Sequence, residues 1–484
     1  MKEMEFRDFN KISDYRWLLE KNKDRTMRVD AEIFASENIL RKAIEDASIQ
    51  QVINVASLNG IIYRSLAMPD IHYGYGFCIG GVAAFLADSG IVLPGGVGYD
   101  INCGVRLIST EITLDEIIKY KESIGYLILD EIPTGLGSKK SFKFSKKDFL
   151  RIIKNGAKEI VDNYSGLNQD LEYIESNGKL DFDSPGIISD RAYERGRAQV
   201  GSLGSGNHFI EIQLIDEIFD EDSAEIFGLK KGNISIMIHT GSRGFGHQIA
   251  SDYIERIRRK NINKIKIKDP QLIYAEISSN EGKNYLQALN AASNFAWANR
   301  HMIMEDVISI FEKFFKSSRK GLGLNLIYDQ AHNIAKFENH VINGEKKRLL
   351  VHRKGATRAF PSAHKDIPEK YRKTGQPVLI PGSMGTASYV LKGTKKAMGL
   401  TFGSSAHGAG RRMSRHKAIK FSSNMNVREE LKKKNIFVFS HSNRGLKEEI
   451  PEAYKDIDEV IKVTEGSGIS TKVARLIPLI VVKG

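Results

Sequence analysis

The sequence predicts an α+β fold, with one large integrated domain of mixed α/β structure over residues 1–484 and a helical insertion at about residues 111–200. The chain is 41% hydrophobic and contains only 11 prolines in 484 residues, so it can bury a large core. Short apolar runs that end in glycine turns and polar residues recur from residue 70 to the C-terminus, which is typical of a site assembled from many loops. The regular strand and helix alternation of a doubly wound parallel sheet does not persist, which argues against that fold.

The first half of the chain divides into three patterns. An amphipathic helical period covers residues 39–55. Residues 61–110 are rich in glycine and short apolar runs, which predicts strands and tight turns. From residue 114 to about residue 178 the sequence is charged and helix-periodic with few special residues, so we expect a supporting helical layer that takes no part in chemistry.

The second half alternates glycine-rich segments with longer periodic ones. Glycine returns at residues 201–215, and residues 233–257 have the pattern of an apolar strand, a glycine turn and a helix. A helical period runs over about residues 284–315. The Asn343-Gly344 pair between two apolar runs predicts a hairpin, and the apolar C-terminal run LIPLIVVKG predicts a final strand.

The charge of the chain favours a polyanionic partner. Lysine and arginine together number 72 against 59 acidic residues, which gives a formal net charge of +13. Such a surface attracts nucleic acid at low salt, although it identifies no site. The alternative is that the charge serves solubility alone.

Cysteine usage and hydropathy bear on the compartment. The two cysteines, Cys78 and Cys103, cannot supply a disulfide framework for a chain of this size, which indicates a reducing environment. The N-terminal segment lacks the apolar core of a secretory signal, and no run of about 18 apolar residues occurs. We therefore expect a cytoplasmic protein that does not insert into a membrane.

Asp100 and Cys103 form the first candidate metal site. They lie three residues apart in GYDINCGVR, where a turn can direct a carboxylate and a thiolate to one point. A thiolate can bridge two cations, and a mixed set of carboxylate, imidazole and sulfur suits Mn²⁺ or Zn²⁺ better than Mg²⁺. Three histidines accompany them: His208 in GSGNHFIEI, His239 in IMIHTGSRG and His332 in YDQAHNIAK. The alternative is a small buried cysteine and three structural histidines.

His407 lies in FGSSAHGAGRRMSR, among residues too small to block a phosphate. If a helix begins just after Gly410, Arg411 and Arg415 fall four apart on one face and can hold phosphate oxygens. The segment then has the pattern of an anion-binding turn. The alternative is a glycine-rich connection followed by an exposed basic helix.

A second candidate phosphate cradle is PGSMGTASYVL, in which Gly382, Ser383, Gly385 and Ser388 offer backbone N–H groups and hydroxyls. It could equally be a tight turn before a strand. No G-x-x-x-x-G-K-[ST] phosphate loop occurs, which disfavours a P-loop nucleotide site. No Asp-Gly dipeptide occurs either, which excludes the K-x-D-G lysine motif of the common nucleotidyl-transferring ligases.

Together these motifs resemble those of the RtcB family of RNA-splicing ligases. The first 60 residues and the region 111–200 carry little of the resemblance. It implies a single RtcB-like catalytic domain. The matching segments run in family order from residue 68 to residue 483: MPDIHYGYGF, GYDINCGVR, GSGNHFIE, HTGSRGFG, AHNIAK, VHRKGATRAF, PGSMGTASY, SSAHGAGR and a lysine one residue from the C-terminus.

The resemblance implies a centre of two Mn²⁺ ions bridged by Cys103. One ion would also take Asp100 and His208, and the other His239 and His332. Carboxylate, imidazole and thiolate are all present at the positions that the family motif requires.

The resemblance also implies that His407 attacks the α-phosphate of GTP and carries GMP through a phosphorus–nitrogen bond. A neutral imidazole suits this step because its ring nitrogen is nucleophilic near pH 7. Within the implied pocket Tyr454 would stack on the base, Lys483 and Glu211 would recognise guanine, and Arg411 and Arg415 would hold RNA phosphate. The implied GTP and GMP pocket comprises Asn207, His208, Phe209, Ile210, Glu211, His332, Asn333, Pro381, Gly382, Ser383, Met384, Ser388, His407, Gly408, Ala409, Gly410, Tyr454 and Lys483.

The implied activity is that of a GTP- and manganese-dependent RNA ligase. It would join 2′,3′-cyclic phosphate or 3′-phosphate ends to 5′-hydroxyl ends, in tRNA splicing or RNA repair. Its partners would be RNA, as tRNA halves or broken RNA, GTP, and an accessory activating protein of the archease type. A two-metal phosphoesterase or nuclease acting on RNA is the main alternative, and it would need no GTP. A non-catalytic RNA-binding protein would leave the metal-ligand set unexplained.

Overall fold

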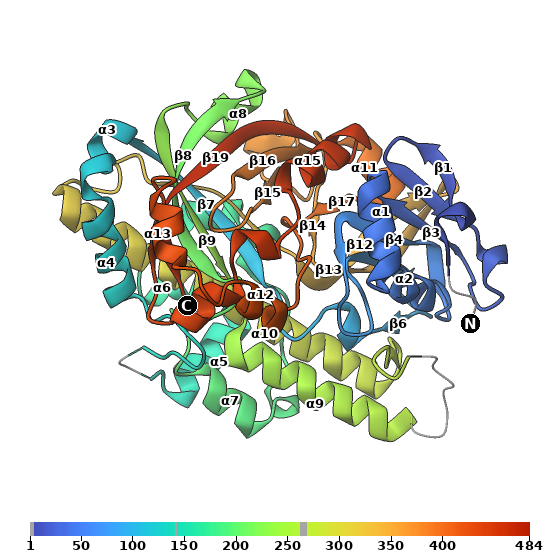
Figure 1. Ribbon diagram of the computed structural model, residues 1–484. Helices are drawn as coiled ribbons and strands as arrows, with labels where there is room; N and C mark the ends of the chain where they lie inside the picture. The colour runs from blue at the N-terminus through green and yellow to red at the C-terminus, as the bar shows by residue number, and fades with distance from the viewer. Residues whose placement is uncertain (1–3, 141–142, 262–268) are drawn as a thin grey trace.

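The computed structural model describes residues 4–140, 143–261 and 269–484 (Figure 1). Two large sheets form its framework. The first has seven strands in the order β1 (Asn10–Ser13), β2 (Arg16–Leu19), β3 (Asp30–Phe34), β4 (Ile61–His72), β5 (Ile79–Leu86), β13 (Glu345–Lys354) and β12 (Asn333–Ile342). The second has eight, in the order β11 (Asn325–Ala331), β7 (Gly104–Thr113), β9 (Asn233–Thr240), β8 (Phe209–Ile218), β19 (Ser470–Lys483), β16 (Ser388–Gly393) and β15 (Pro377–Ile380), with β18 (Phe437–Phe439) beside β19.

Two short pairs of strands complete the sheet structure, β10 (Ala275–Glu276) with β6 (Ile91–Val92) and β14 (Ala356–Arg358) with β17 (Ser404–Ala406). Among the named strands of the described residues, only β3 with β4 and β18 with β19 pair in parallel. The other pairs are antiparallel, so the molecule is an α+β protein and not a doubly wound parallel one. The predicted fold class is confirmed.

The helices gather in two main groups. One group, α1 (Glu37–Glu45) and α2 (Ser48–Ala56), connects β3 to β4 of the first sheet and confirms the predicted amphipathic period. Helix α11 (Lys395–Thr401) lies between β16 and β17. The other group belongs to the centre and the C-terminal part of the chain: α3 (Leu114–Ile117), α4 (Lys121–Glu131), α5 (Lys146–Asn155), α6 (Ala157–Asn163), α7 (Asp190–Gly196), α8 (Glu221–Phe227), α9 (Arg243–Asn261), α10 (Asn280–Phe315), α12 (Arg415–Phe421), α13 (Val427–Lys432), α14 (Asn443–Glu448) and α15 (Ile457–Gly466).

Helix α10 is the central helix of the largest hydrophobic cluster. It begins where the Ser279 hydroxyl accepts a hydrogen bond from the N–H of Gly282, and it ends at Lys316, whose φ is 50°. Alanine is frequent along its buried stretch, which lets neighbouring elements approach closely. Helices α4, α5, α6 and α9 and strand β9 all contact it, and in Figure 1 α5, α7, α9 and α10 lie together below the second sheet. The helical layer expected from residue 114 is thereby confirmed, while the division into one domain with an insertion stays a prediction.

The predicted hairpin at Asn343-Gly344 is also confirmed. Strands β12 and β13 pair from Asn333 opposite Lys354 to Ile342 opposite Glu345, and both turn residues have positive φ. This is the backbone geometry that an Asn-Gly turn favours. None of the described helices is long and apolar enough to cross a membrane.

Candidate metal and nucleotide site

Four neighbouring strands of the second sheet bring the candidate metal ligands together. Cys103 precedes β7 and His208 precedes β8, His239 lies at the end of β9, and His332 follows β11. The strands are adjacent in the order β11-β7-β9-β8, and the register pairs Gly104 with residues 240 and 331. Because neighbouring antiparallel strands share this edge, residues more than 200 positions apart in the sequence meet there.

A buried arginine, Arg300, holds the turn that carries Asp100 and Cys103 in place. The N–H of Cys103 donates to the carbonyl of Asp100 at 3.0 Å, and Asn102 between them has a φ of 53°. Arg300 of α10 donates to the carbonyl of Asn102 at 2.7 Å and to that of Thr240 at 2.9 Å. The same guanidinium pairs with the buried Asp329. The ends of β7 and β9 are therefore tied together directly behind the cluster.

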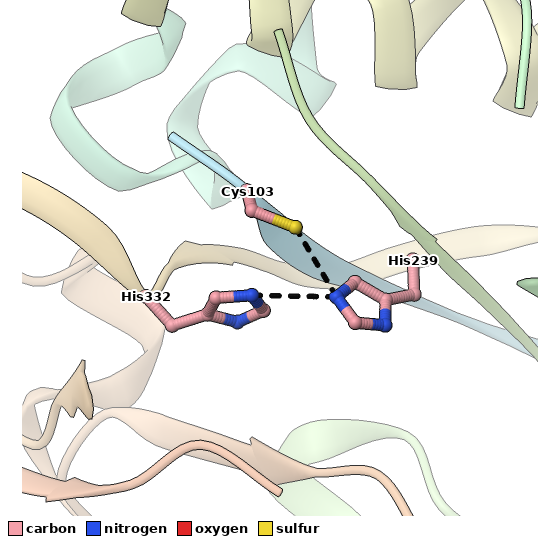
Figure 2. A group of neighbouring side chains, drawn as sticks. All are labelled: Cys103, His239 and His332. Carbon is pink, nitrogen blue, oxygen red and sulfur yellow. Dashed lines mark hydrogen bonds between the residues drawn. The ribbon is translucent and has the colours of Figure 1, made fainter. Parts of the chain in front are cut away.

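The five predicted ligands form two groups that share Cys103, and Figure 2 shows the group of Cys103, His239 and His332. The Cys103 Sγ lies 3.3 Å from the Nε2 of His239, which in turn lies 3.3 Å from the Nε2 of His332. On its other side Cys103 Sγ is 3.4 Å from the Nε2 of His208, and that nitrogen is 2.9 Å from the Oδ2 of Asp100. The structure thus brings together every residue of the predicted ligand set.

The electrostatics of the group suit a cation. Burial lowers the pKa of both His239 and His332 well below the usual value, so both rings are neutral and carry a lone pair. His208 Nδ1 donates to the carbonyl of Leu203 at 3.1 Å, which orients the ring so that its Nε2 faces Cys103 and Asp100. Burial and the charge of Asp100 raise the pKa of the Cys103 thiol well above its usual value. A bound cation would reverse that shift by stabilising the thiolate.

His407 lies beside this cluster, and a buried carboxylate holds it in place. It follows β17, and its ring centre is 4.8 Å from that of His332. The Oδ2 of Asp70, in β4, accepts from the Nδ1 of His407 at 2.5 Å and from the backbone N–H groups of His407 at 2.9 Å and Gly408 at 3.3 Å. Burial alone would raise the pKa of Asp70, but the His407 contacts outweigh it and the pKa is lowered. Nδ1 therefore carries the proton, and Nε2 is the nitrogen with a free lone pair.

The cluster and His407 share one cavity of about 400 Å³, a size typical of small-molecule sites. Residues from both sheets and from the loops after β15 and β17 line it. The predicted site residues among them are Asp100, Cys103, Asn207, Phe209, His239, His332, Asn333, Pro381, Gly382, Ser383, Met384, His407, Gly408, Ala409, Gly410, Arg411, Arg415, Tyr454 and Lys483.

Four predicted pocket residues do not line the cavity: Ile210, Glu211, Ser388 and His208, whose ring belongs to the ligand group beside it. Glu211 and Ser388 are buried behind it, and the Gln213 amide joins them by donating to the Glu211 carboxylate at 2.7 Å and to the Ser388 hydroxyl at 3.1 Å. Ser388 in turn accepts from the N–H of Gly382 in the lining at 3.1 Å. The Ile210 side chain packs in the main hydrophobic cluster, because alternate residues of β8 face opposite sides. Only the backbone of Ile210 is then available to a nucleotide.

The predicted helix after Gly410 is wrong. Gly410 has a φ of 73°, and a Cβ there would lie 2.4 Å from the carbonyl oxygen of Asp70. The next residue, Arg411, forms an antiparallel bridge with Tyr454, and α12 begins only after Ser414, whose hydroxyl accepts from the N–H of Lys417. The two arginines are therefore not four apart on one helix face.

Arg411 and Arg415 nevertheless converge, because one buried glutamate pairs with both. Glu449 accepts from Arg411 at 2.7 Å and from Arg415 at 3.3 Å, and the hydroxyl of Tyr454 donates to it. Burial would raise the pKa of Glu449, but Lys483 and the two arginines lower it below the usual value. The carboxylate is thus ionised at the wall of the cavity.

Lys483 is ordered and buried although it is the penultimate residue. It ends β19 opposite Phe209 of β8, and its side chain is 3% exposed. Burial lowers its pKa, while the charges of Glu449 and Glu211 act in the opposite direction. The predicted C-terminal strand is confirmed, and it places the Lys483 amine at the end of the cavity that Glu449 also lines.

Several residues of the site escaped the sequence analysis. Asp70 and Lys354 lie in the segments MPDIHYGYGF and VHRKGATRAF, so the signal was present but was not assigned to a side chain. The Lys354 amine donates to the carbonyls of Tyr75 and Phe77 at 2.8 Å and lines the cavity. Glu449 has no local signal, because only the folded chain surrounds it with cations.

We expect Asp70→Asn to slow the guanylylation that the family resemblance implies at His407 by roughly 10²- to 10⁴-fold, as when a carboxylate that fixes a histidine tautomer is replaced by its amide. The amide can donate to Nδ1, which favours the tautomer with the proton on Nε2. The rate of adduct formation measures the effect. Asp88→Asn, at an exposed aspartate beyond β5, is the control. A normal rate for Asp70→Asn would contradict the orienting role.

Comparison with known proteins agrees with the resemblance of the motifs. The model of the family described as tRNA-splicing ligase RtcB matches residues 51–484. The chain is 48% identical to the tRNA-splicing ligase RtcB of Methanococcus maripaludis, over 95% of each chain. It is 47% identical to that of Thermococcus kodakarensis over 98% of each chain, and 43% identical to RNA-splicing ligase RtcB homolog 1 of Entamoeba dispar over 95% of this chain and 88% of that one. With a matching family model over most of its length and a metal-ligand cluster beside an oriented histidine, this chain belongs to the RtcB family of tRNA-splicing ligases.

Proposed function

We propose that this protein is an RNA ligase that joins 2′,3′-cyclic phosphate or 3′-phosphate ends to 5′-hydroxyl ends through a covalent GMP on His407. The observation that supports it most is the shared cavity. His407, with Nδ1 held by Asp70, lies there beside the cluster of Cys103, His239 and His332. The physiological setting would be tRNA splicing, RNA repair or both.

The first step is guanylylation. The Nε2 lone pair of His407 attacks the α-phosphorus of GTP, a phosphorus–nitrogen bond forms, and the bond to the bridging oxygen breaks so that pyrophosphate leaves. Positive charge develops on the ring, and the carboxylate of Asp70 at Nδ1 stabilises it. Asp70 acts here as a positioning residue that does not itself touch the nucleotide.

The next two steps transfer GMP and then displace it. An oxygen of the RNA 3′-phosphate attacks the phosphorus of the bound GMP and releases His407 with its lone pair. The 5′-hydroxyl oxygen of the second RNA end then attacks the 3′-phosphorus, loses its proton, and GMP departs. A cyclic phosphate end is first opened by water to the 3′-phosphate.

The ligand set fits two manganese ions. Asp100, Cys103 and His208 would hold one, and Cys103, His239 and His332 the other. Bound there, the ions would neutralise charge on the phosphoryl oxygens. The residues around them contribute orientation: Arg300 fixes the turn of Asp100 and Cys103, and the Leu203 carbonyl fixes the ring of His208.

The base end of the nucleotide pocket is proposed at Lys483. Its ammonium group is suited to the acceptor atoms O6 and N7 of guanine, and the carboxylate of Glu449, which lines the same end of the cavity, is suited to the N–H donors of the opposite edge. The loops at residues 381–384 and 407–410 would face the phosphates, because their small residues admit close backbone approach. Tyr454 at the same wall supplies a ring for the base.

Intact-protein mass after incubation with GTP and Mn²⁺ tests the proposal. A mass increment of one GMP is expected with GTP, and none with ATP or without metal. A two-metal phosphoesterase or nuclease would hydrolyse RNA without forming any adduct. RNA cleavage with no adduct would therefore favour that alternative and reject the ligase.

Lys483→Met is expected to raise the KM for GTP in guanylylation by roughly 10- to 100-fold, since a hydrogen bond from a charged group is lost. The protein should remain folded because Arg411 still pairs with Glu449 and the backbone of β19 is unchanged. The matched control is Lys392→Met. Lys392 lies on β16 of the same sheet and pairs with Asp220. An unchanged KM in a folded Lys483→Met protein would remove this residue from the pocket.

A further inference from the structure

The positive charge of the chain is concentrated in one segment beside the cavity. Residues 411–447 contain eleven lysines and arginines and only two acidic residues, so they contribute nine of the thirteen net positive charges of the protein. We call this segment, which includes α12, α13 and α14 as far as Lys447, the basic lobe. Figure 1 shows α12 and α13 near the C-terminus.

The basic lobe is a folded surface and not a loose tail. The side chains of Ala418, Val427, Leu431 and Leu446 are buried in one hydrophobic cluster and join its three helices. Polar contacts add to this packing, since the Lys447 amine donates to the carbonyl of Ser423 at 2.7 Å. The positions of its exposed cations are therefore set by the fold.

The part of the lobe nearest the cavity is largely neutralised. Arg411 and Arg415 pair with Glu449, and Arg444 pairs with Glu448. Lys433 similarly pairs with Glu430 on the surface of α13. These ion pairs neutralise only part of the excess positive charge of the basic lobe.

The outer cations have no such compensation. Arg412, Lys417, Lys420 and Lys434 are exposed and form no ion pair with any carboxylate of residues 4–140, 143–261 or 269–484. Phe421 follows Lys420 and is 54% exposed. Unpaired cations with an exposed aromatic ring among them are the usual elements of a surface that binds a nucleic acid strand.

The lobe is continuous with the proposed site. Its first residues, Arg411 and Arg415, line the cavity, and Arg415 begins the same helix that carries Lys417 and Lys420. A cavity of about 400 Å³ is of nucleotide size, so an RNA whose end reaches the cluster must continue outside it. A strand that leaves past Arg415 meets α12 next.

We infer that the basic lobe binds the phosphate backbone of the substrate RNA beyond the end being joined. The inference rests on the proposed ligase function, and it assigns to the lobe affinity for RNA without base specificity. The contacts are electrostatic, so they should weaken steeply with salt. An acidic protein partner is the alternative occupant.

The triple substitution Lys417→Glu, Lys420→Glu and Lys434→Glu tests the inference. At low salt the affinity for a structured RNA of tRNA size with a 3′-phosphate is expected to fall at least about tenfold. The slope of log affinity against log salt should become shallower by about 2, since each lost phosphate contact removes about 0.7 to 0.9. Guanylylation by GTP, which needs no RNA, should stay within about twofold and shows that the site is intact.

The matched control is the triple substitution Lys313→Glu, Lys320→Glu and Lys346→Glu, which makes the same charge change at exposed lysines that line no part of the cavity. Equal losses of RNA affinity in both triples would show that only net charge matters, and unchanged affinity in the lobe triple would also reject the inference.

Normal RNA binding with lost binding of an acidic protein would assign the lobe to that partner instead. If the lobe triple destabilises the protein, the glutamine triple at the same positions gives the same comparison. A wild-type protein that forms no guanylate would instead reject the proposed function itself.

Discussion

His407→Ala is expected to form no covalent guanylate with GTP and Mn²⁺, a loss of about 10⁴-fold or more in adduct formation, as for removal of a catalytic nucleophile. Among the cavity residues, His407 alone combines a nucleophilic nitrogen with small neighbours and a carboxylate that fixes its tautomer. Of the other cavity histidines, His239 and His332 belong to the metal-ligand group, and the Nδ1 of His72 donates to the carbonyl of Asp70 at 2.8 Å. Intact-protein mass with peptide mapping measures the outcome.

Two further variants and two further measurements on His407→Ala complete this test. His407→Asn keeps a donor toward Asp70, so it separates loss of the nucleophile from loss of a buried hydrogen bond, and it too should form no adduct. His441→Ala, at an exposed histidine, should react normally. His407→Ala should retain both metals and still join an RNA that already carries a 3′-guanylate. A GMP adduct of normal yield on another residue would overturn the assignment.

Long periodic elements and short turn signals could be predicted from the sequence. Helix α10 was expected over about residues 284–315 and spans Asn280–Phe315, the earlier start being set by the Ser279 cap. The Asn343-Gly344 hairpin and the final strand were also correct, because in each the local chemistry and the tertiary contacts favour the same conformation. No sequence pattern indicates β1 to β3, short strands that pair with one another in order and reach β4 only through β3.

The residues of the site also fall into those that a sequence motif identifies and those that only the fold brings together. The five predicted metal ligands and His407 each lie in a distinctive motif, and the structure places them side by side, with all of them but His208 lining one cavity. The spacing of Arg411 and Arg415 suggests a helix directly after Gly410, which is wrong because the positive φ of Gly410 and the cap at Ser414 delay the helix to Arg415. Glu449 could not be predicted, since its partners come from residues 411, 415, 454 and 483, which only the fold assembles.

We expect the folded Cys103→Ser protein to lose both metal ions. The affinity for each ion should fall by about 100-fold or more, since even a residue that only orients a ligand usually costs 10- to 100-fold in metal affinity. Cys103 lies between the two ligand groups, 3.3 Å from His239 and 3.4 Å from His208. A serine hydroxyl stays protonated where a thiol can ionise, so it supplies no negative charge to either ion. Metal analysis of dialysed protein gives the stoichiometry directly.

Two control variants extend this test to a series that differs in the number of metal ions bound. Cys78→Ser replaces the other buried cysteine, whose pKa burial raises to about 12 and which packs in a separate hydrophobic cluster, so it should keep both ions. His208→Gln should lose one ion, because that ring belongs to only one of the two groups. The expected metal content is then two for Cys78→Ser, one for His208→Gln and none for Cys103→Ser. Cobalt in place of manganese adds a thiolate charge-transfer band that only proteins with Cys103 can show. Two ions bound at normal affinity to folded Cys103→Ser would mean that the imidazoles and Asp100 suffice, and that the thiolate bridges nothing.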